Sequence, residues 1–110
     1  MNSKQAHILI VDDAQDLREM FALYLTGKGY RVSMARDGKE GLDKTFGLMP
    51  DLGLLDLWLP EISGWEVLHR LKSNARTTHI PVVVLTGHIM APPRECDGFL
   101  TKPFQLEELS

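Results

Sequence analysis

The chain has 110 residues, of which 44% are hydrophobic and 25% are charged, and its formal net charge is −3. These values are typical of one globular domain and exclude a disordered chain. The acidic balance gives no basic face for nucleic acid, and the single cysteine excludes an internal disulfide. The apolar run before Asp12 is too short for a signal peptide, and no run is long enough to span a membrane. We therefore expect a cytoplasmic protein that binds neither nucleic acid nor membrane.

Strands and helices alternate along the first half of the chain. Residues 7–11 form an apolar run of strand length that ends in two acids, Asp12 and Asp13. Apolar residues at helical spacing follow from about residue 14 and stop at the glycines around residue 28. A second strand is predicted over 30–35. The helix predicted over 39–48 is weak, since two glycines and a threonine lower its propensity.

A short apolar run over 52–55 ends in Asp56. Because the run is apolar at every position and bounded by prolines, it predicts a strand that is buried on both faces. A carboxylate after such a strand is costly unless it lies at the carboxyl end of the strand, in a crevice with partners. Asp56 is therefore the residue around which a site is expected.

Three further elements are predicted in the second half. Ser63 and Glu66 form a capping box that starts a helix through Leu71. Strands follow over 82–86 and 98–102, the first ending in Thr86 and the second in Lys102. The alternation of strands and helices predicts a parallel α/β sheet with right-handed crossovers.

Parallel strands end at one edge of a sheet, so Asp12, Asp13 and Asp56 should meet there. Three carboxylates in one crevice resist joint ionisation unless a cation lies among them. A set of oxygen ligands without histidine or cysteine favours a hard cation such as Mg²⁺. The sequence therefore predicts a magnesium site at this edge.

Five motifs in register resemble the receiver domain of two-component response regulators. They are the paired acids at 12–13, Leu-Leu-Asp at 54–56, the Pro60 and Gly64 that follow it, Leu-Thr-Gly at 85–87 and Thr-Lys-Pro-Phe at 101–104. The resemblance covers nearly the whole chain, so we expect one receiver domain over 1–110. It implies a three-layer, flavodoxin-like, doubly wound parallel sheet of five strands in the order 2-1-3-4-5.

The resemblance also implies the roles of the acidic residues. Asp56 would accept a phosphoryl group from a sensor histidine kinase or a histidine phosphotransfer protein. Mg²⁺ would be held by Asp12, Asp13, Asp56 and the backbone carbonyl of Trp58, with Mn²⁺ or Ca²⁺ as substitutes. The indole of Trp58, two residues after Asp56, has two interpretations: it shields the phosphoryl group from water, or it is an exposed bystander.

Residues near the last two strands complete the implied site. Thr86, Gly87 and Lys102 would contact the phosphoryl group, and Lys102-Pro103 is a candidate cis peptide. Phe99 occupies the position of the family's aromatic switch, although a core aromatic is an equal interpretation. His88 borders the site and would modulate hydrolysis.

The late helices depart from the family pattern. Pro92-Pro93 interrupts the predicted fourth helix, in which at most one turn could start at Pro93. The fifth helix would start near Phe104 and is short. With both helices shortened, we expect a monomer whose phosphorylation changes the loop over 87–97, and whose downstream protein partner is unknown.

Two other functions remain open at this point. A pseudo-receiver would keep the fold as a binding surface without phosphorylation. A haloacid-dehalogenase-like phosphatase would use the same aspartyl-phosphate chemistry, but it needs an acid two residues after the nucleophile, where Trp58 stands. The favoured interpretation is a signalling domain and not an enzyme.

Overall fold

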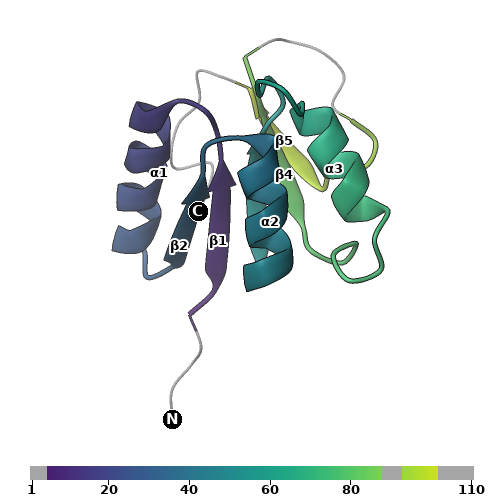
Figure 1. The fold of residues 1–110 in the computed structure, drawn as a ribbon. Helices are drawn as coiled ribbons and strands as arrows, with labels where there is room; N and C mark the ends of the chain where they lie inside the picture. The colour runs from purple at the N-terminus through teal and green to yellow at the C-terminus, as the bar shows by residue number, and fades with distance from the viewer. Residues whose placement is uncertain (1–4, 88–92, 102–110) are drawn as a thin grey trace.

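The computed structural model describes residues 5–87 and 93–101, with only the backbone of Thr86 and Thr101. A five-stranded sheet forms its centre (Figure 1). The strands are β1 (His7–Val11), β2 (Arg31–Ala35), β3 (Leu52–Asp56), β4 (Val82–Thr86) and β5 (Gly98–Thr101). They lie in the order β2-β1-β3-β4-β5, and all four neighbouring pairs are parallel. The predicted order is confirmed.

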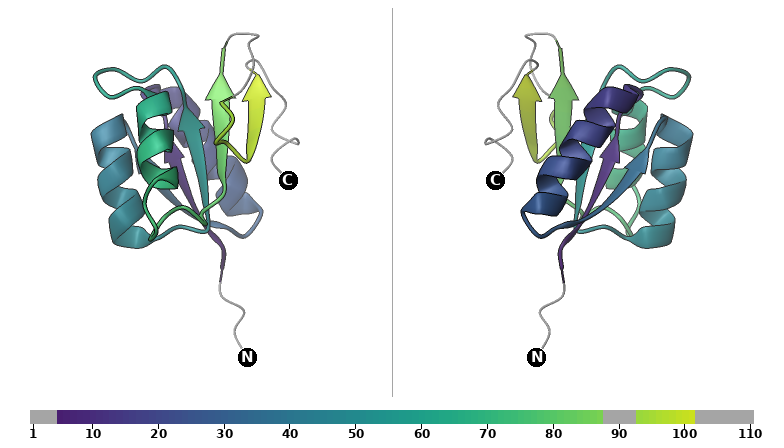
Figure 2. Two further views of the ribbon diagram at one scale, coloured as in Figure 1. Left: turned by 90° about the vertical axis from the view of Figure 1, so that its right-hand side faces the viewer. Right: turned by 90° about the vertical axis from the view of Figure 1, so that its left-hand side faces the viewer.

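Three helices lie in the described part of the chain: α1 (Gln15–Gly27), α2 (Gly38–Leu48) and α3 (Gly64–Lys72). Helix α1 covers one face of the sheet, and α2 and α3 cover the other (Figure 2). Helices on both faces of a parallel sheet make a doubly wound, three-layer α/β fold, as the sequence predicted. None of these helices has the length and apolar character needed to cross a membrane.

The sheet divides the core into two halves. The half under α1 consists of Ile8, Ile10, Phe21, Leu25, Leu54 and Leu85. The half under α2 and α3 consists of Leu9, Val11, Ala35, Leu42, Leu55, Leu57, Leu59, Val67, Leu68, Leu71, Val82 and Val84. Strands β1, β3 and β4 contribute to both halves, which explains why their sequences are apolar at successive positions.

The weak helix α2 forms because of its cap and its packing. The carboxylate of Asp37 accepts a hydrogen bond from the backbone N–H of Glu40 at 2.8 Å and caps the first turn. A Cβ atom on Gly41 would come within 2.9 Å of Val11, so the glycine lets the helix approach β1 closely. Tertiary packing thus offsets the low propensity predicted for this segment.

The observed ends of the first elements differ from the predicted ends by one residue. Helix α1 begins at Gln15, β2 at Arg31 and α2 at Gly38. In the late region, the N–H of Cys96 donates to the carbonyl of Pro93 at 3.2 Å. This hydrogen bond closes one turn, which is the most that the sequence was expected to allow there. The rest of the predicted fourth helix, over 88–92, and the predicted fifth helix lie outside the described residues.

Candidate functional site

Three carboxylates meet at the carboxyl edge of the sheet. Asp12 and Asp13 follow β1, and Asp56 is the last residue of the neighbouring strand β3. The register pairs Val11 with Leu55, which places the acids after both strands at one level. Carboxylate oxygens of the three acids lie within 4.8 Å of one another. The structure therefore brings together the acids that the sequence assigned to this edge.

Two of these acids are withdrawn from solvent. Asp12 is 0% exposed and Asp56 is 4% exposed, whereas Asp13 is exposed. Oδ1 of Asp12 accepts a hydrogen bond from the N–H of Ala14 at 2.9 Å, and Oδ1 of Asp56 accepts one from the N–H of Trp58 at 3.1 Å. Each buried carboxylate is thus oriented by the loop that follows it. Because burial and like charge both disfavour ionised carboxylates, the arrangement favours a cation among them.

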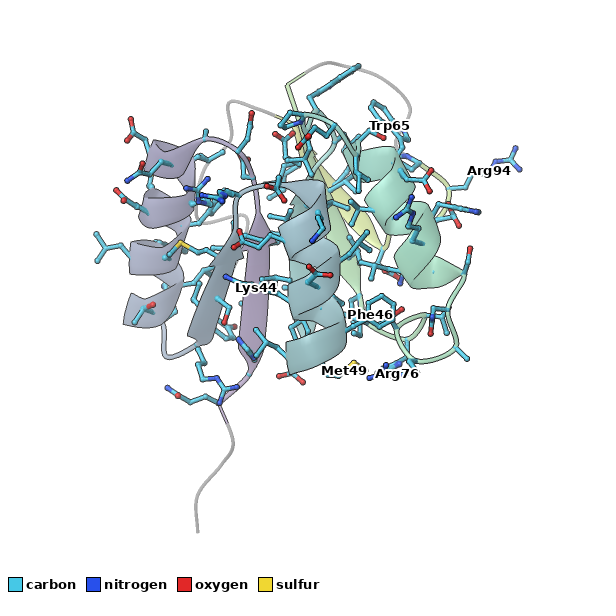
Figure 3. All side chains as sticks on the ribbon, in the orientation of Figure 1. Lys44, Phe46, Met49, Trp65, Arg76 and Arg94 are labelled. Carbon is cyan, nitrogen blue, oxygen red and sulfur yellow. The ribbon has the colours of Figure 1, made fainter. Side chains whose placement is uncertain are left out.

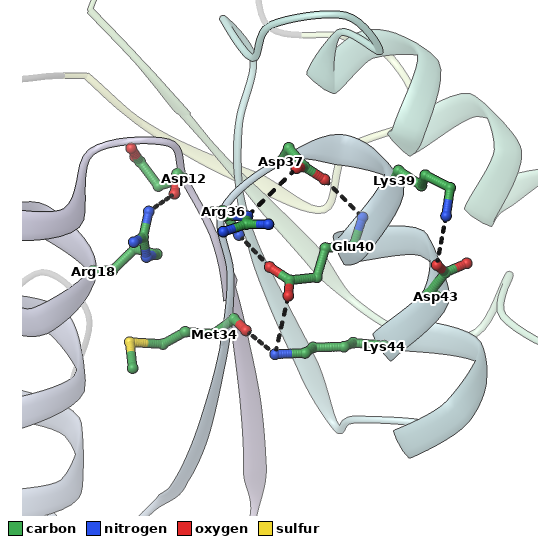
Figure 4. A network of polar contacts seen from close by, with 9 residues as sticks. All are labelled: Asp12, Arg18, Met34, Arg36, Asp37, Lys39, Glu40, Asp43 and Lys44. Carbon is green, nitrogen blue, oxygen red and sulfur yellow. Dashed lines mark hydrogen bonds and ion pairs between the residues drawn. The ribbon is translucent and has the colours of Figure 1, made fainter.

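The loop that carries Asp12 is fixed from both sides. Nη1 of Arg18 donates to the backbone carbonyl of Asp12 at 2.8 Å (Figure 4). The N–H of Asp12 donates to the carbonyl of Ala35 at the end of β2, at 3.1 Å. Sequence analysis missed Arg18, although a basic residue in the first turns of the helix after an acid pair is an available signal.

A charged network at the start of α2 adjoins this loop. The N–H of Arg36 donates to Glu40 at 2.8 Å, and Lys44 binds both the carbonyl of Met34 and the carboxylate of Glu40 (Figure 4). These contacts join β2 to α2. In contrast to the three acids, the charged groups of this network lie in pairs of opposite sign.

The three carboxylates fit a small divalent cation. Mg²⁺ binds oxygen ligands at about 2.0–2.1 Å in an octahedron, so that opposite ligands lie about 4.2 Å apart. Carboxylate oxygens within 4.8 Å of one another need only small movements to share such an ion. The group contains neither histidine nor cysteine, which favours a hard cation over a softer one.

The start of α3 packs directly on the backbone of Asp56. A Cβ atom on Gly64 would overlap the carbonyl oxygen of Asp56 and the Cα atom of Leu57, so only glycine fits there. The N–H of Gly64 donates to the carbonyl of Leu57 at 2.9 Å. The Ser63 hydroxyl accepts from the N–H of Glu66 at 3.2 Å, as predicted for the cap. Helix α3 therefore begins at a fixed position relative to Asp56.

Comparison with known proteins identifies the family. The model of the response regulator receiver domain matches residues 8–110. The chain belongs to this family. Receiver domains of response regulators are signalling domains, and the fold and acidic cluster described above agree with the match.

Several relatives extend this result. The DNA-binding dual master transcriptional regulator RpaA of Synechocystis is 39% identical over 93% of this chain and 45% of its own length. The chain spans about half the length of the curated relatives it matches. A putative response regulator from Chloroflexus aurantiacus is 35% identical, with a TM-score of 0.89 over 96% of this chain and 92% of that chain.

A solved receiver domain bears on the metal. This domain of a sensor histidine kinase from Pseudomonas aeruginosa PAO1 is 25% identical, with a TM-score of 0.87 over 96% of this chain and 92% of that chain. It was solved with a magnesium ion coordinated in its active-site cleft. Receiver domains bind Mg²⁺ at an acidic cluster of aspartates, and this chain has such a cluster.

The described residues include only part of the remaining receiver motifs, at the end of β4 and within β5. Thr86 ends β4 and pairs in register with Thr101, and the exposed Gly87 follows Thr86. Phe99 is 48% exposed and so is not a core aromatic; its switch role stays a prediction. The side chain of Thr86, together with His88, Lys102 and the Lys102-Pro103 bond, lies outside the described residues. The roles predicted for these groups are therefore also still predictions.

Two tryptophans, one after β3 and one at the start of α3, contact each other. Trp58 follows β3 and is 49% exposed. Trp65 in α3 (Figure 3) packs against the core, as predicted. The centroids of the two rings are 4.8 Å apart, and the ring planes meet at 82°. Sequence analysis treated the two residues separately, because seven positions along an irregular loop give no signal of ring contact.

Proposed function

We propose that this receiver domain is a phosphoacceptor. Asp56 takes a phosphoryl group from a phosphohistidine on a sensor histidine kinase or a histidine phosphotransfer protein, in a reaction that depends on Mg²⁺. One observation carries the proposal. Asp56 is 4% exposed at the end of the central strand, and its carboxylate oxygen lies within 4.8 Å of those of two further acids.

The chemistry follows from this arrangement. A carboxylate oxygen of Asp56 forms a bond to phosphorus while the bond from phosphorus to the donor's histidine nitrogen breaks, and the histidine leaves with that electron pair. Negative charge spreads over the three equatorial oxygens during transfer, so placement and charge neutralisation dominate the barrier. The hydrogen bond from the Trp58 N–H sets the rotation of the Asp56 carboxylate before transfer. Bound Mg²⁺ supplies the neutralising charge.

The other residues of the site have supporting roles in this proposal. Asp12, Asp13 and the backbone carbonyl of Trp58 hold Mg²⁺, for which Mn²⁺ or Ca²⁺ substitutes. By the family pattern, the Thr86 hydroxyl, the Gly87 N–H and the Lys102 ammonium bind the phosphoryl oxygens. A point charge on a flexible stem, as lysine provides, suits the last role.

The proposed biological role is a phosphorylation-controlled switch. The domain works in the cytoplasm as a monomer, is phosphorylated by its kinase or phosphotransfer protein, and is recognised by a downstream protein. Neither nucleic acid nor membrane contacts this domain directly. The family match to signalling domains supports a switch over an enzyme.

Phosphoryl uptake tests the proposal. The protein is incubated with a small acyl-phosphate donor and Mg²⁺, and its intact mass is measured with time. We expect a gain of one phosphoryl mass that disappears when Mg²⁺ is chelated, and no gain in Asp56→Asn. Asp43→Asn is the matched control, since Asp43 is an exposed acid on α2 that pairs with Lys39 at 3.5 Å.

The outcomes separate the candidate functions. Uptake that persists in Asp56→Asn would reject Asp56 as the acceptor. A folded wild-type protein that gains no mass with any donor, including a phosphorylated phosphotransfer protein, would favour the pseudo-receiver.

A further inference from the structure

The geometry points to Trp65 as a positioning residue for the lifetime of the phosphoryl group. It acts through Trp58: the contact between the two rings holds the Trp58 indole in one orientation beside Asp56, where it keeps water from the acyl phosphate. This inference rests on the proposed function, because it concerns the phosphorylated state of Asp56.

The backbone near Asp56 is already rigid. Leu57 and Leu59 are 0% and 8% exposed, so the chain on either side of Trp58 is anchored in the core. The N–H of Trp58 donates to Asp56 at 3.1 Å. The indole is therefore attached to the site at its Cα atom, and its remaining freedom lies in its own side-chain torsions.

Trp65 limits those torsions through a direct ring contact. Trp58 is 49% exposed, which for a residue of this size leaves much of the ring in water. The ring contacts Trp65 at a centroid distance of 4.8 Å and an angle of 82°, the edge-to-face arrangement that aromatic pairs favour. An exposed ring without such a contact samples several rotamers. The contact with Trp65 therefore favours one orientation of the Trp58 ring.

Trp65 itself cannot move far. It is the second residue of α3, packs against the core under α2 and α3, and follows a glycine that abuts the backbone of Asp56. The ring of Trp65 is thus fixed in relation to the nucleophile. Because the Trp65 ring is held in place, its contact with the exposed Trp58 ring restricts the movement of that ring as well.

Ring orientation matters because hydrolysis needs a water molecule in line. The water oxygen forms a bond to phosphorus, and the bond from phosphorus to the Asp56 oxygen breaks. The carboxylate is restored, inorganic phosphate leaves, and the water's second proton passes to the phosphate or to solvent. An indole held beside the acyl phosphate obstructs this approach continuously, whereas a rotating indole does so for part of the time.

The test measures decay of the phosphoprotein. The wild type, Trp65→Leu, Trp65→Phe, Trp58→Asn and the double variant Trp58→Asn/Trp65→Leu are phosphorylated with a small donor and Mg²⁺. The donor is then removed, and loss of the phosphoryl mass is followed. We expect Trp65→Leu to shorten the lifetime about two- to tenfold, the range set by the strength of an aromatic pair. Trp65→Phe, which keeps an aromatic partner, should recover most of the loss.

The double variant separates positioning from other effects. Because Trp65 acts through Trp58, the double variant should decay at the rate of Trp58→Asn alone. Near-ultraviolet circular dichroism of the unphosphorylated proteins should show a tryptophan-pair signal in the wild type that all three single variants lose. Thermal melts and Mg²⁺ titrations verify that each variant is folded and binds the ion.

Several results would overturn the inference. One is an unchanged lifetime in Trp65→Leu, and another is a Trp65→Leu effect of equal size with and without Trp58. If the wild type and Trp65→Leu both take up the phosphoryl group and lose it at equal rates, only the positioning role of Trp65 is rejected. If the wild type takes up no phosphoryl group, the proposed function is rejected as well.

Discussion

The two edges of the sheet use charge in opposite ways. At the carboxyl edge, Asp12, Asp13 and Asp56 gather three like charges within 4.8 Å, two of them buried. At the amino edge, acidic side chains accept hydrogen bonds from backbone N–H groups and from a lysine ammonium. These contacts join neighbouring strands to one another. The same parallel sheet therefore gathers three like charges at one edge and pairs complementary groups at the other.

A repeated clamp defines the amino edge. Asp51, just before β3, donates its N–H to the carbonyl of His7 at 2.7 Å and accepts the N–H of His7 on Oδ2 at 2.7 Å. Asp97, just before β5, does the same with Val82, with both distances 2.8 Å. Each clamp fixes the register between neighbouring strands where the ladder begins.

Lys72 strengthens the second clamp. Its ammonium, on a side chain that is 12% exposed, donates to Asp97 at 2.8 Å and to the carbonyls of Thr78 and Ile80 at 3.2 and 2.7 Å. Burial by itself would raise the pKa of Asp97, but hydrogen bonds from Lys72 and Val82 and the charge of Lys72 bring that pKa below its usual 3.8. Ionised Asp97 thus stabilises the folded protein.

The difference between the edges indicates that one edge stabilises the fold and the other forms the candidate metal site. The amino edge contributes to the stability of the fold, while the carboxyl edge gathers acids that could hold a cation. A substitution at the amino edge should lower stability and leave Mg²⁺ affinity unchanged. A substitution at the carboxyl edge should weaken Mg²⁺ binding and change stability in a way that depends on the metal.

The largest stability loss is expected for Lys72→Met. Methionine keeps much of the apolar stem but removes the ammonium, leaving two carbonyls and Asp97 without their shared donor. We expect the free energy of unfolding to fall by about 1–3 kcal/mol. Denaturation in urea measures this loss, and titration with Mg²⁺ should give an unchanged affinity.

Lys39→Met is the control for Lys72→Met. Lys39 is 81% exposed and pairs with Asp43 at 3.5 Å, so its removal should change stability by less than about 0.5 kcal/mol. Equal effects of the two substitutions, or a weaker Mg²⁺ affinity in Lys72→Met, would contradict the division between the edges.

The acidic edge could be predicted from the sequence, for a simple reason. Each of the strands before Asp12 and Asp56 is an apolar run whose end is visible in the letters, and parallel strands must end together. The order of the strands came from the family resemblance, and the structure confirms it. The same logic placed Thr86 at the end of β4, next to β5.

The amino edge could not be predicted in this way. One acid before a strand, such as Asp51 or Asp97, has the sequence pattern of any turn residue, and its clamp depends on which strand lies beside it. The contact of Trp58 with Trp65 depends likewise on the course of the intervening loop, in which Glu61 takes a left-handed conformation with φ of 63°. Long-range contacts made by irregular backbone have no periodic signal.

The next largest effect concerns Asp12→Asn, and its sign should depend on the metal. Without Mg²⁺, asparagine removes one of three like charges and can still accept the N–H of Ala14 on Oδ1, so unfolding should require about 1 kcal/mol more than in the wild type. At Mg²⁺ about 100-fold above the wild-type dissociation constant, the wild type gains about 2.7 kcal/mol. The variant, with at least about tenfold weaker binding, gains less, and the order of stability should reverse.

Urea denaturation with chelator and with saturating Mg²⁺ measures both signs in one series. Asp43→Asn again serves as the control, since it removes a carboxylate outside the cluster and should show no reversal. If Asp12→Asn lowered the unfolding free energy of the metal-free protein, repulsion among the three carboxylates would not be the main effect of Asp12 on stability.

The smallest effect is expected from His7, at the first clamp of the amino edge. Arg31 can only donate, so Nδ1 of His7 accepts from it at 3.2 Å and Nε2 carries the proton toward the Ser33 hydroxyl at 2.7 Å. Burial and the neighbouring Arg31 lower the pKa of His7 from 6.5, against the opposing charge of Asp51. The unfolded chain therefore binds more protons in this range, so stability is complete above pH 6.5 and falls as the pH drops through 6.5 toward the lower folded pKa. His7→Gln should flatten the dependence of the unfolding free energy on pH between about 7.5 and 5. If the unfolding free energy had the same slope against pH in the wild type and in His7→Gln, protonation of His7 would not contribute to the stability of the amino edge. The hydrogen bonds of that edge would then be its stabilising contribution.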